Sequence, residues 1–270
     1  MTDSAPQPTS RRLRPLAIGV AVLIPLIPIV IALSLGGGGA AVAVTTTSTS
    51  TSHYTPVTPV PKPAPANLLL PPGTGALVAL VLHATAMRSS PGGRVFARLS
   101  TRTQFGSPTT VWVARLSGSW LGVVTPQAGN NHLGWIPASD ASLSRVHWEL
   151  KLSLSARQLT VLHGNRVMHR YTVAIGAPAN PTPTGRFAVT DRLNTGDPTG
   201  PYGCCILALS AQAPHAIQDW SGGNRIAIHS TPETSSIGQA VSHGCVRLTL
   251  PEGQWLLDHI PLGTPTLISG

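Results

Sequence analysis

Short runs of alternating apolar and polar residues, separated by glycine, proline and asparagine, fill most of the chain after residue 75. Runs of about four to eight residues with such separators are typical of strands in small β domains. Over residues 76–145 the pattern predicts five strands: Ala76–Leu82, Arg94–Leu99, Thr110–Leu116, Trp120–Val124 and Leu133–Pro137.

The C-terminal half shows the same kind of pattern. It predicts strands at Glu149–Leu154, Gln158–His163, Arg166–Ile175, Arg186–Thr190 and Thr264–Ile268. One helix is predicted after Pro251, because proline suits the first helical position; it would carry Trp255, Leu256 and Leu257 inward. The chain is therefore expected to be mainly β, with a small helical element.

A different pattern marks the N-terminus, where residues 15–35 form a nearly uncharged apolar run. A transmembrane helix needs about 20 such residues. Three arginines within residues 11–14 precede the run and no Lys or Arg follows it before Lys62, so residues 1–14 are expected in the cytoplasm and the remainder outside. Ala41-Val42-Ala43 also resembles a signal-peptide cleavage site, but the run is longer than a usual signal peptide, which favours an uncleaved membrane anchor.

A Thr/Ser-rich and then Pro-rich tract at residues 45–72 predicts an extended linker, because such a composition buries too little apolar surface to fold. Residues 76–145 follow it. They resemble bacterial SH3-like domains in Trp112-Val113, in Trp120 to Val123 and in Gly134 to Pro137. The resemblance implies a small β-barrel whose tryptophans form its core or, alternatively, bind a ligand.

Composition narrows the possible partners. The formal net charge is +9, from 18 Lys and Arg against 9 Asp and Glu. A basic chain can bind nucleic acid, an anionic membrane or an acidic polymer. The arginines are mostly scattered, with no basic helix, so the sequence favours an acidic cell envelope over nucleic acid.

The three cysteines are Cys204, Cys205 and Cys245. An odd number in an exported chain predicts at least one free thiol. Because a disulfide normally joins more widely separated Cα atoms, Cys204 and Cys205 are expected to be two small buried side chains and not a bridge.

The segments Ile226–Ser230 and Val241–Leu248 carry the chemistry that the sequence suggests. An apolar run ends in His229, a loop of a dozen residues follows, and the chain returns through Ser242, His243, Gly244 and Cys245. A free thiol has a pKa of about 8.5, so a nearby imidazole is needed to form thiolate at neutral pH. Such a pair can attack a carbonyl and later return the proton to the leaving amine.

Two neighbours suit the same chemistry. Gly244 allows close approach of the backbone, so that the N–H groups of Gly244 and Cys245 could face a developing oxyanion. Arg247, two residues after the thiol, can offer a bidentate fork to a substrate carboxylate.

These residues resemble the signature of the L,D-transpeptidase (YkuD-like) family, and the resemblance extends over residues 148–270. It implies that Cys245 is the nucleophile and that His229 is its base, steadied by the Ser230 carbonyl. It also implies that Ser242, His243 and Gly244 shape the pocket and the oxyanion site, that Arg247 contacts substrate, and that the catalytic domain is β-sandwich-like. Ser230 stands where the family often has glycine. Tyr202 is a candidate lid over the substrate, with plain packing as the alternative.

The activity implied by this resemblance is cross-linking of peptidoglycan stem peptides. Cys245 would attack the carbonyl before a terminal D-Ala, release D-alanine and pass the acyl group to an amine, giving a 3→3 cross-link. No metal or cofactor is expected, and carbapenem-type β-lactams are expected inhibitors. The alternatives are a hydrolase of L,D-carboxypeptidase type and a non-catalytic wall-binding protein. A zinc site at His229, His243 and Cys245 is disfavoured, because the sequence offers no fourth ligand at suitable spacing.

Overall fold

The computed structural model describes residues 70, 73–214 and 223–270. The predicted membrane anchor at 15–35 and nearly all of the predicted linker at 45–72 lie outside these residues. Among the helices within the described ranges, none is both long and apolar enough to cross a membrane.

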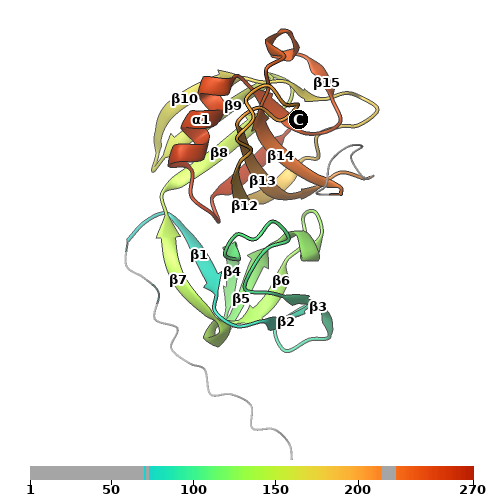
Figure 1. Ribbon diagram of the computed structural model, residues 1–270. Coiled ribbons are helices and arrows are strands. Elements are labelled where there is room, and N and C mark those ends of the chain that lie inside the picture. The colour runs from blue at the N-terminus through green and yellow to red at the C-terminus, as the bar shows by residue number, and fades with distance from the viewer. Residues whose placement is uncertain (1–69, 71–72, 215–222) are drawn as a thin grey trace, which may run out of the picture. The chain divides into compact units, whose positions relative to one another are not determined.

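The first part of the chain forms a seven-stranded antiparallel sheet with the strand order β3-β2-β6-β5-β4-β1-β7 (Figure 1). Its strands are β1 (Ala76–Val81), β2 (Thr85–Arg88), β3 (Val95–Leu99), β4 (Thr110–Ser117), β5 (Trp120–Val124), β6 (Gly134–Pro137) and β7 (Ala141–Val146).

The five strands predicted in this part are confirmed, and β2 and β7 were missed. Strand β2 is only four residues long. Strand β7 alternates half-buried and exposed positions and contains two serines, so its apolar signal is weak. Both strands are held mainly by pairing to stronger neighbours, β3 and β1.

The second part forms an eight-stranded mixed sheet with the order β10-β9-β8-β17-β12-β13-β14-β16, a separate two-stranded sheet of β11 and β15, and one α-helix (Figure 1). The elements are β8 (Trp148–Ser153), β9 (Gln158–His163), β10 (Arg166–Thr172), β11 (Ile175–Gly176), β12 (Gly185–Asn194), β13 (Cys205–Gln212), β14 (Arg225–Ser230), β15 (Ala240–Ser242), β16 (Val246–Leu248), α1 (Leu250–His259) and β17 (Pro265–Ser269).

One hydrophobic core serves this whole part. Leu150 of β8, Leu207 of β13, Ile226 of β14 and Leu256 of α1 are almost completely buried in the same cluster. The cluster joins strands from both ends of the sheet, so the sheet folds round a single core. The mainly β architecture with one helix is confirmed.

Helix α1 begins one residue earlier than predicted, at Leu250, so Pro251 takes the second helical position. Thr249 caps it: the Thr249 N–H and hydroxyl both donate to the Glu252 carboxylate, at 3.0 and 2.7 Å. Glu252 in the first turn also suits the positive end of the helix dipole.

The predicted strand Arg166–Ile175 is wrong at its C-terminal end. Strand β10 stops at Thr172, and β11 leaves the large sheet to pair in parallel with β15. Ala174, which lies between β10 and β11, exchanges both backbone hydrogen bonds with Arg247, at 3.0 and 2.9 Å. The tertiary pairing with Arg247 thus overrides a period-two pattern that continues through Ile175.

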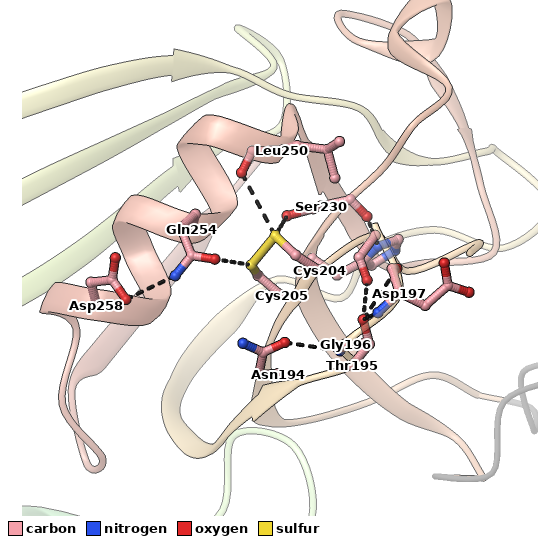
Figure 2. The surroundings of a disulfide bond; sticks show 12 residues. Asn194, Thr195, Gly196, Asp197, Cys204, Cys205, Ser230, Leu250, Gln254 and Asp258 are labelled. Carbon is pink, nitrogen blue, oxygen red and sulfur yellow. Dashed lines mark hydrogen bonds between the residues drawn. A yellow bond between two sulfur atoms is a disulfide. The ribbon is translucent and has the colours of Figure 1, made fainter. Parts of the chain in front are cut away.

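The expectation that Cys204 and Cys205 are unbridged is also wrong, because they form a disulfide (Figure 2). Their Cα atoms are 3.7 Å apart, below the usual separation for a disulfide. Cys204 lies in the turn before β13 and Cys205 is the first residue of that strand. The two side chains therefore do not point to opposite faces, as neighbours within a strand would. Both sulfurs therefore face helix α1. The predicted free thiol is Cys245.

Candidate active site

A parallel pair of strands at the edge of the large sheet brings the predicted site residues together. Strands β14 and β16 pair so that His229 lies opposite Arg247. Cys245 immediately precedes β16, and its sulfur accepts a hydrogen bond from the Ala227 N–H at 3.4 Å. Ala227 is two residues before His229 on the same strand. Residues that carry a thiol, an imidazole and a guanidinium are thus brought from two chain segments to neighbouring positions at this edge of the sheet.

The His229 ring is oriented by backbone carbonyls. Its Nδ1 lies 2.7 Å from the carbonyl oxygen of Ser230. Because a carbonyl can only accept, Nδ1 carries the proton and Nε2 of the neutral ring is left as the base. The Tyr202 backbone also forms a hydrogen bond that favours the charged ring. Both bonds would stabilise the imidazolium that forms when His229 takes a proton.

Burial nevertheless keeps the resting pair uncharged. His229 is 3% exposed and Cys245 is 5% exposed. Burial lowers the pKa of His229 to about 4, with a further contribution from Arg247. Burial likewise raises the pKa of the Cys245 thiol to about 11, although the Ala227 N–H and Arg247 favour the thiolate. Burial of both groups therefore favours a neutral thiol and a neutral imidazole in the resting site.

The backbone at the thiol is fixed by two buried hydroxyls. Ser242 Oγ donates to the Cys245 carbonyl at 2.5 Å and accepts from the Gly244 N–H at 3.1 Å. Thr182 Oγ1 donates to the Gly244 carbonyl at 2.8 Å and accepts from the Gly176 N–H. Gly244 has φ +114°, which side chains rarely allow. The Gly244 N–H, predicted as an oxyanion donor, is thus engaged by Ser242 in this structure.

We expect Ser242→Ala to destabilise the protein by about 1–3 kcal/mol, because it leaves a buried N–H and a buried carbonyl without their partner. Ser242 is 1% exposed, so water cannot replace the hydroxyl. Denaturant unfolding of the variant and the parent measures the loss. Ser144→Ala, at an exposed position of β7, is the matched control. Equal stability of the two variants would contradict the role given to Ser242.

Among the described residues, no carboxylate forms an ion pair with the positively charged Arg247. Its Nε is buried and has no hydrogen-bond partner. The ion pair found among the described residues joins Lys151 and Glu149, far from this site in the sequence. A half-buried guanidinium in this state is suited to an anionic group brought by a ligand.

The remaining predicted residues occupy three different settings. The Tyr202 ring packs edge-on against His229, with ring centroids 5.0 Å apart. Ser230 is fully buried and its hydroxyl contacts the sulfur of Cys204 at 3.4 Å. The His243 side chain is exposed. In the part of the chain that the structure describes, no three His, Cys, Asp or Glu side chains gather to hold a metal ion.

Sequence reasoning missed Thr182 and Ala227. Thr182 lies in the Pro181–Gly185 segment, and nothing in the sequence of that segment indicates its position against Gly244. Ala227 acts through its backbone N–H, so its side chain gives no signal. The distance in sequence between these segments explains why neither was found.

Comparison with known proteins identifies relatives of the C-terminal part of the chain. Residues 148–268 match the family model described as YkuD, the L,D-transpeptidase catalytic domain. The protein named L,D-transpeptidase YkuD in Bacillus subtilis is 34% identical over 124 residues, which cover 46% of this chain and 67% of that protein. L,D-transpeptidase 1 of Mycobacterium tuberculosis is 31% identical over 129 residues, covering 44% and 49% of the two chains. The solved structure of the L,D-transpeptidase LdtMt1 in complex with imipenem is 18% identical, with a TM-score of 0.39, and covers 60% of this chain and 90% of the other.

The family model and the sequence relatives thus define the class to which residues 148–268 belong. The chain belongs to the L,D-transpeptidase family.

Proposed function

We propose that the protein is a peptidoglycan L,D-transpeptidase that forms 3→3 cross-links through a thioester on Cys245. The observation that supports the proposal is the β14–β16 pairing, in which His229 lies opposite Arg247 and the free cysteine Cys245 immediately precedes β16. The family match supports the same reaction class.

The first half-reaction forms the thioester. His229 Nε2 takes the proton of the Cys245 thiol while the sulfur attacks the carbonyl before the terminal D-Ala. The carbonyl of Ser230, with the Tyr202 backbone, stabilises the imidazolium. The imidazolium then protonates the leaving amine, the C–N bond breaks and D-alanine departs.

The second half-reaction transfers the acyl group. An amine of a neighbouring stem peptide attacks the thioester, His229 accepts its proton, and the thiol of Cys245 is regenerated as the new amide forms. If water attacks instead, the product is a shortened stem, which is the L,D-carboxypeptidase alternative.

Arg247 is proposed to bind a carboxylate of the donor stem, because its Nε is buried without a partner. We expect Arg247→Lys to lower donor use by about 10- to 100-fold, since lysine keeps the charge but loses the planar fork. Acylation by a small uncharged thiol reagent should hardly change. Comparing the two rates in variant and parent tests this. Equal losses with both substrates would instead assign Arg247 to support of the local fold.

Product analysis tests the proposed reaction. The full-length protein is incubated with disaccharide-tetrapeptides, and the products are identified by mass spectrometry. Dimers formed with loss of one D-alanine support the transpeptidase; shortened monomers alone support the hydrolase. Unchanged substrate, with no acyl-enzyme detected, would favour a non-catalytic wall-binding protein.

Carbapenem-type β-lactams are proposed inhibitors, because a strained β-lactam carbonyl can acylate the same thiol. The solved structure of LdtMt1 holds imipenem. A mass increase equal to one imipenem, located on the peptide that contains Cys245, is the expected result.

We further propose that residues 15–35 anchor the protein in the bacterial cytoplasmic membrane, with residues 1–14 inside and the catalytic part on the wall side. The apolar run and its arginine flank support this. N-terminal sequencing of the mature protein is the test, since a start at Val44 would indicate a cleaved signal peptide. The seven-stranded part is proposed to be SH3-like and to bind cell-wall material.

A further inference from the structure

The Cys204–Cys205 disulfide lies between helix α1 and the strand that carries His229. Cys204 Sγ is 3.4 Å from the Ser230 hydroxyl and 3.8 Å from the Leu250 carbonyl oxygen. Cys205 Sγ is 3.2 Å from Gln254 Oε1. Figure 2 shows the two sulfurs with Ser230 on one side and Leu250 and Gln254 of the helix on the other.

Both backbone groups that hold the His229 ring are close to this disulfide. Ser230, whose carbonyl accepts from Nδ1, touches Cys204 through its own hydroxyl. Tyr202, whose backbone also bonds the ring, is two residues before Cys204. The disulfide closes a small ring through the peptide bond between the two cysteines, and so restricts the turn that carries Tyr202.

The turn between Tyr202 and the disulfide has little freedom of its own. Gly203 has φ +55°, and a Cβ there would come within 2.6 Å of the Ser230 Cβ. The Cys204 carbonyl accepts from the Thr195 N–H at 2.8 Å, and the Gly203 carbonyl accepts from the Thr195 hydroxyl. A shift at Cys204 would therefore displace Gly203 and Ser230, because these residues are in close contact.

The surroundings suit the reduced state as well. A disulfide sulfur has no proton to donate, so its contacts with the Leu250 and Gln254 oxygens are not hydrogen bonds. After reduction, each thiol would have an oxygen acceptor within reach, at Leu250, Gln254 or Ser230. Cys204 is half-buried, so a reductant has partial access to it.

We propose that the Cys204–Cys205 disulfide positions His229 for acyl transfer, and that its reduction reversibly slows the enzyme. This inference rests on the proposed function of Cys245 and His229. In the switching step a dithiol donates two electrons and two protons: the Cys204–Cys205 bond breaks, two thiols form, and the dithiol becomes a disulfide. The return step needs a two-electron oxidant, either a disulfide that becomes a dithiol or a diazene that becomes a hydrazine, and re-forms the Cys204–Cys205 bond.

The experiment compares the oxidised and reduced forms of the full-length protein. A phosphine reduces the sample, becoming a phosphine oxide whose oxygen comes from water, and is removed by desalting. N-ethylmaleimide added under denaturing conditions should label one cysteine in the oxidised form and three in the reduced form. Three labels without any reductant would overturn the proposal, because the disulfide would not exist.

Two measurements on these samples then test positioning. We expect the rate of Cys245 acylation by imipenem to fall about 10- to 100-fold on reduction, as for a small misplacement of a catalytic group. Reoxidation with diamide should restore it. The NMR signals of the His229 ring, assigned by their loss in His229→Gln, should shift on reduction and return on reoxidation.

Matched variants complete the test. Cys204→Ala/Cys205→Ala should react slowly and show no response to the phosphine. An unchanged acylation rate and unchanged His229 signals in the reduced parent would overturn the inference. If the oxidised parent is not acylated at all, the proposed function fails, and the His229 signals alone then decide whether the disulfide positions the ring.

Discussion

Cys245→Ala is expected to remove acyl transfer, lowering product formation by a factor on the order of 10⁴ or more, because no other group can form the thioester. Cys245 is the free cysteine among the described residues and is almost fully buried beside Ala227 and Arg247. The small change in volume should leave the fold intact. The measurement is the rate of cross-link formation, with covalent labelling by imipenem as the second readout.

The other two cysteines provide the control. Cys204→Ala should still be labelled by imipenem, at the lower rate expected when the disulfide is lost. If labelling persisted in Cys245→Ala, the nucleophile would lie elsewhere and the assignment of the β14–β16 edge as the active site would be wrong.

His229→Gln is expected to lower the rate of thioester formation by about 10²- to 10⁴-fold, the usual contribution of a general base. Glutamine can still donate a hydrogen bond to the Ser230 carbonyl, so the strand should stay in place. The fall in the rate of thioester formation would then measure the missing base. Single-turnover acylation by a donor stem measures it. A rate within twofold of the parent would exclude His229 as the base.

The same variant should change the dependence of stability on pH. The pKa of His229 is about 4 in the folded protein and 6.5 in the unfolded chain. Between these values the unfolded state binds a proton that the folded state does not, so the parent loses about 1.4 kcal/mol of stability per pH unit as the pH falls. His229→Gln lacks this loss. Denaturant unfolding at pH 7 and pH 4.5 should therefore show a relative gain for the variant at the lower pH; parallel curves would contradict a buried neutral imidazole.

The strands that sequence patterns predicted best are those with strong local signals. Trp120–Val124 and Gln158–His163 were predicted with the bounds that the structure shows, because turn residues flank each of them. Strand β2 was missed because it is only four residues long. Strand β11 was merged with β10 because its pairing with the distant strand β15 leaves no local signal. Cys205–Gln212 reads as a plain apolar run, which gives no period to distinguish a strand from a buried helix.

The sequence predicted those residues of the candidate site that lie in the Ile226–Ser230 and Val241–Leu248 segments. Cys245, His229 and Arg247 follow from residue type and spacing, and the parallel register explains why two segments separated by a loop converge. Thr182, which holds the Gly244 carbonyl, and the Cys204–Cys205 disulfide were not predictable. The position of Thr182 depends on how two separate segments pack, whereas the bridge between the adjacent Cys204 and Cys205 depends on the backbone geometry of one turn. No local sequence pattern encodes either feature.

The chain that joins β14 to β16 can change in length without moving His229 or Cys245. Residues Pro232 to Ser235 are exposed, and the short 3₁₀ turn at Thr234–Ser236 lies between the two strands. An insertion at Ser235 would lengthen this crossover without shifting the His229–Arg247 register, because that register is fixed by backbone pairing. The segment is therefore a natural graft point, where loops exchanged between relatives would leave the His229–Arg247 register in place.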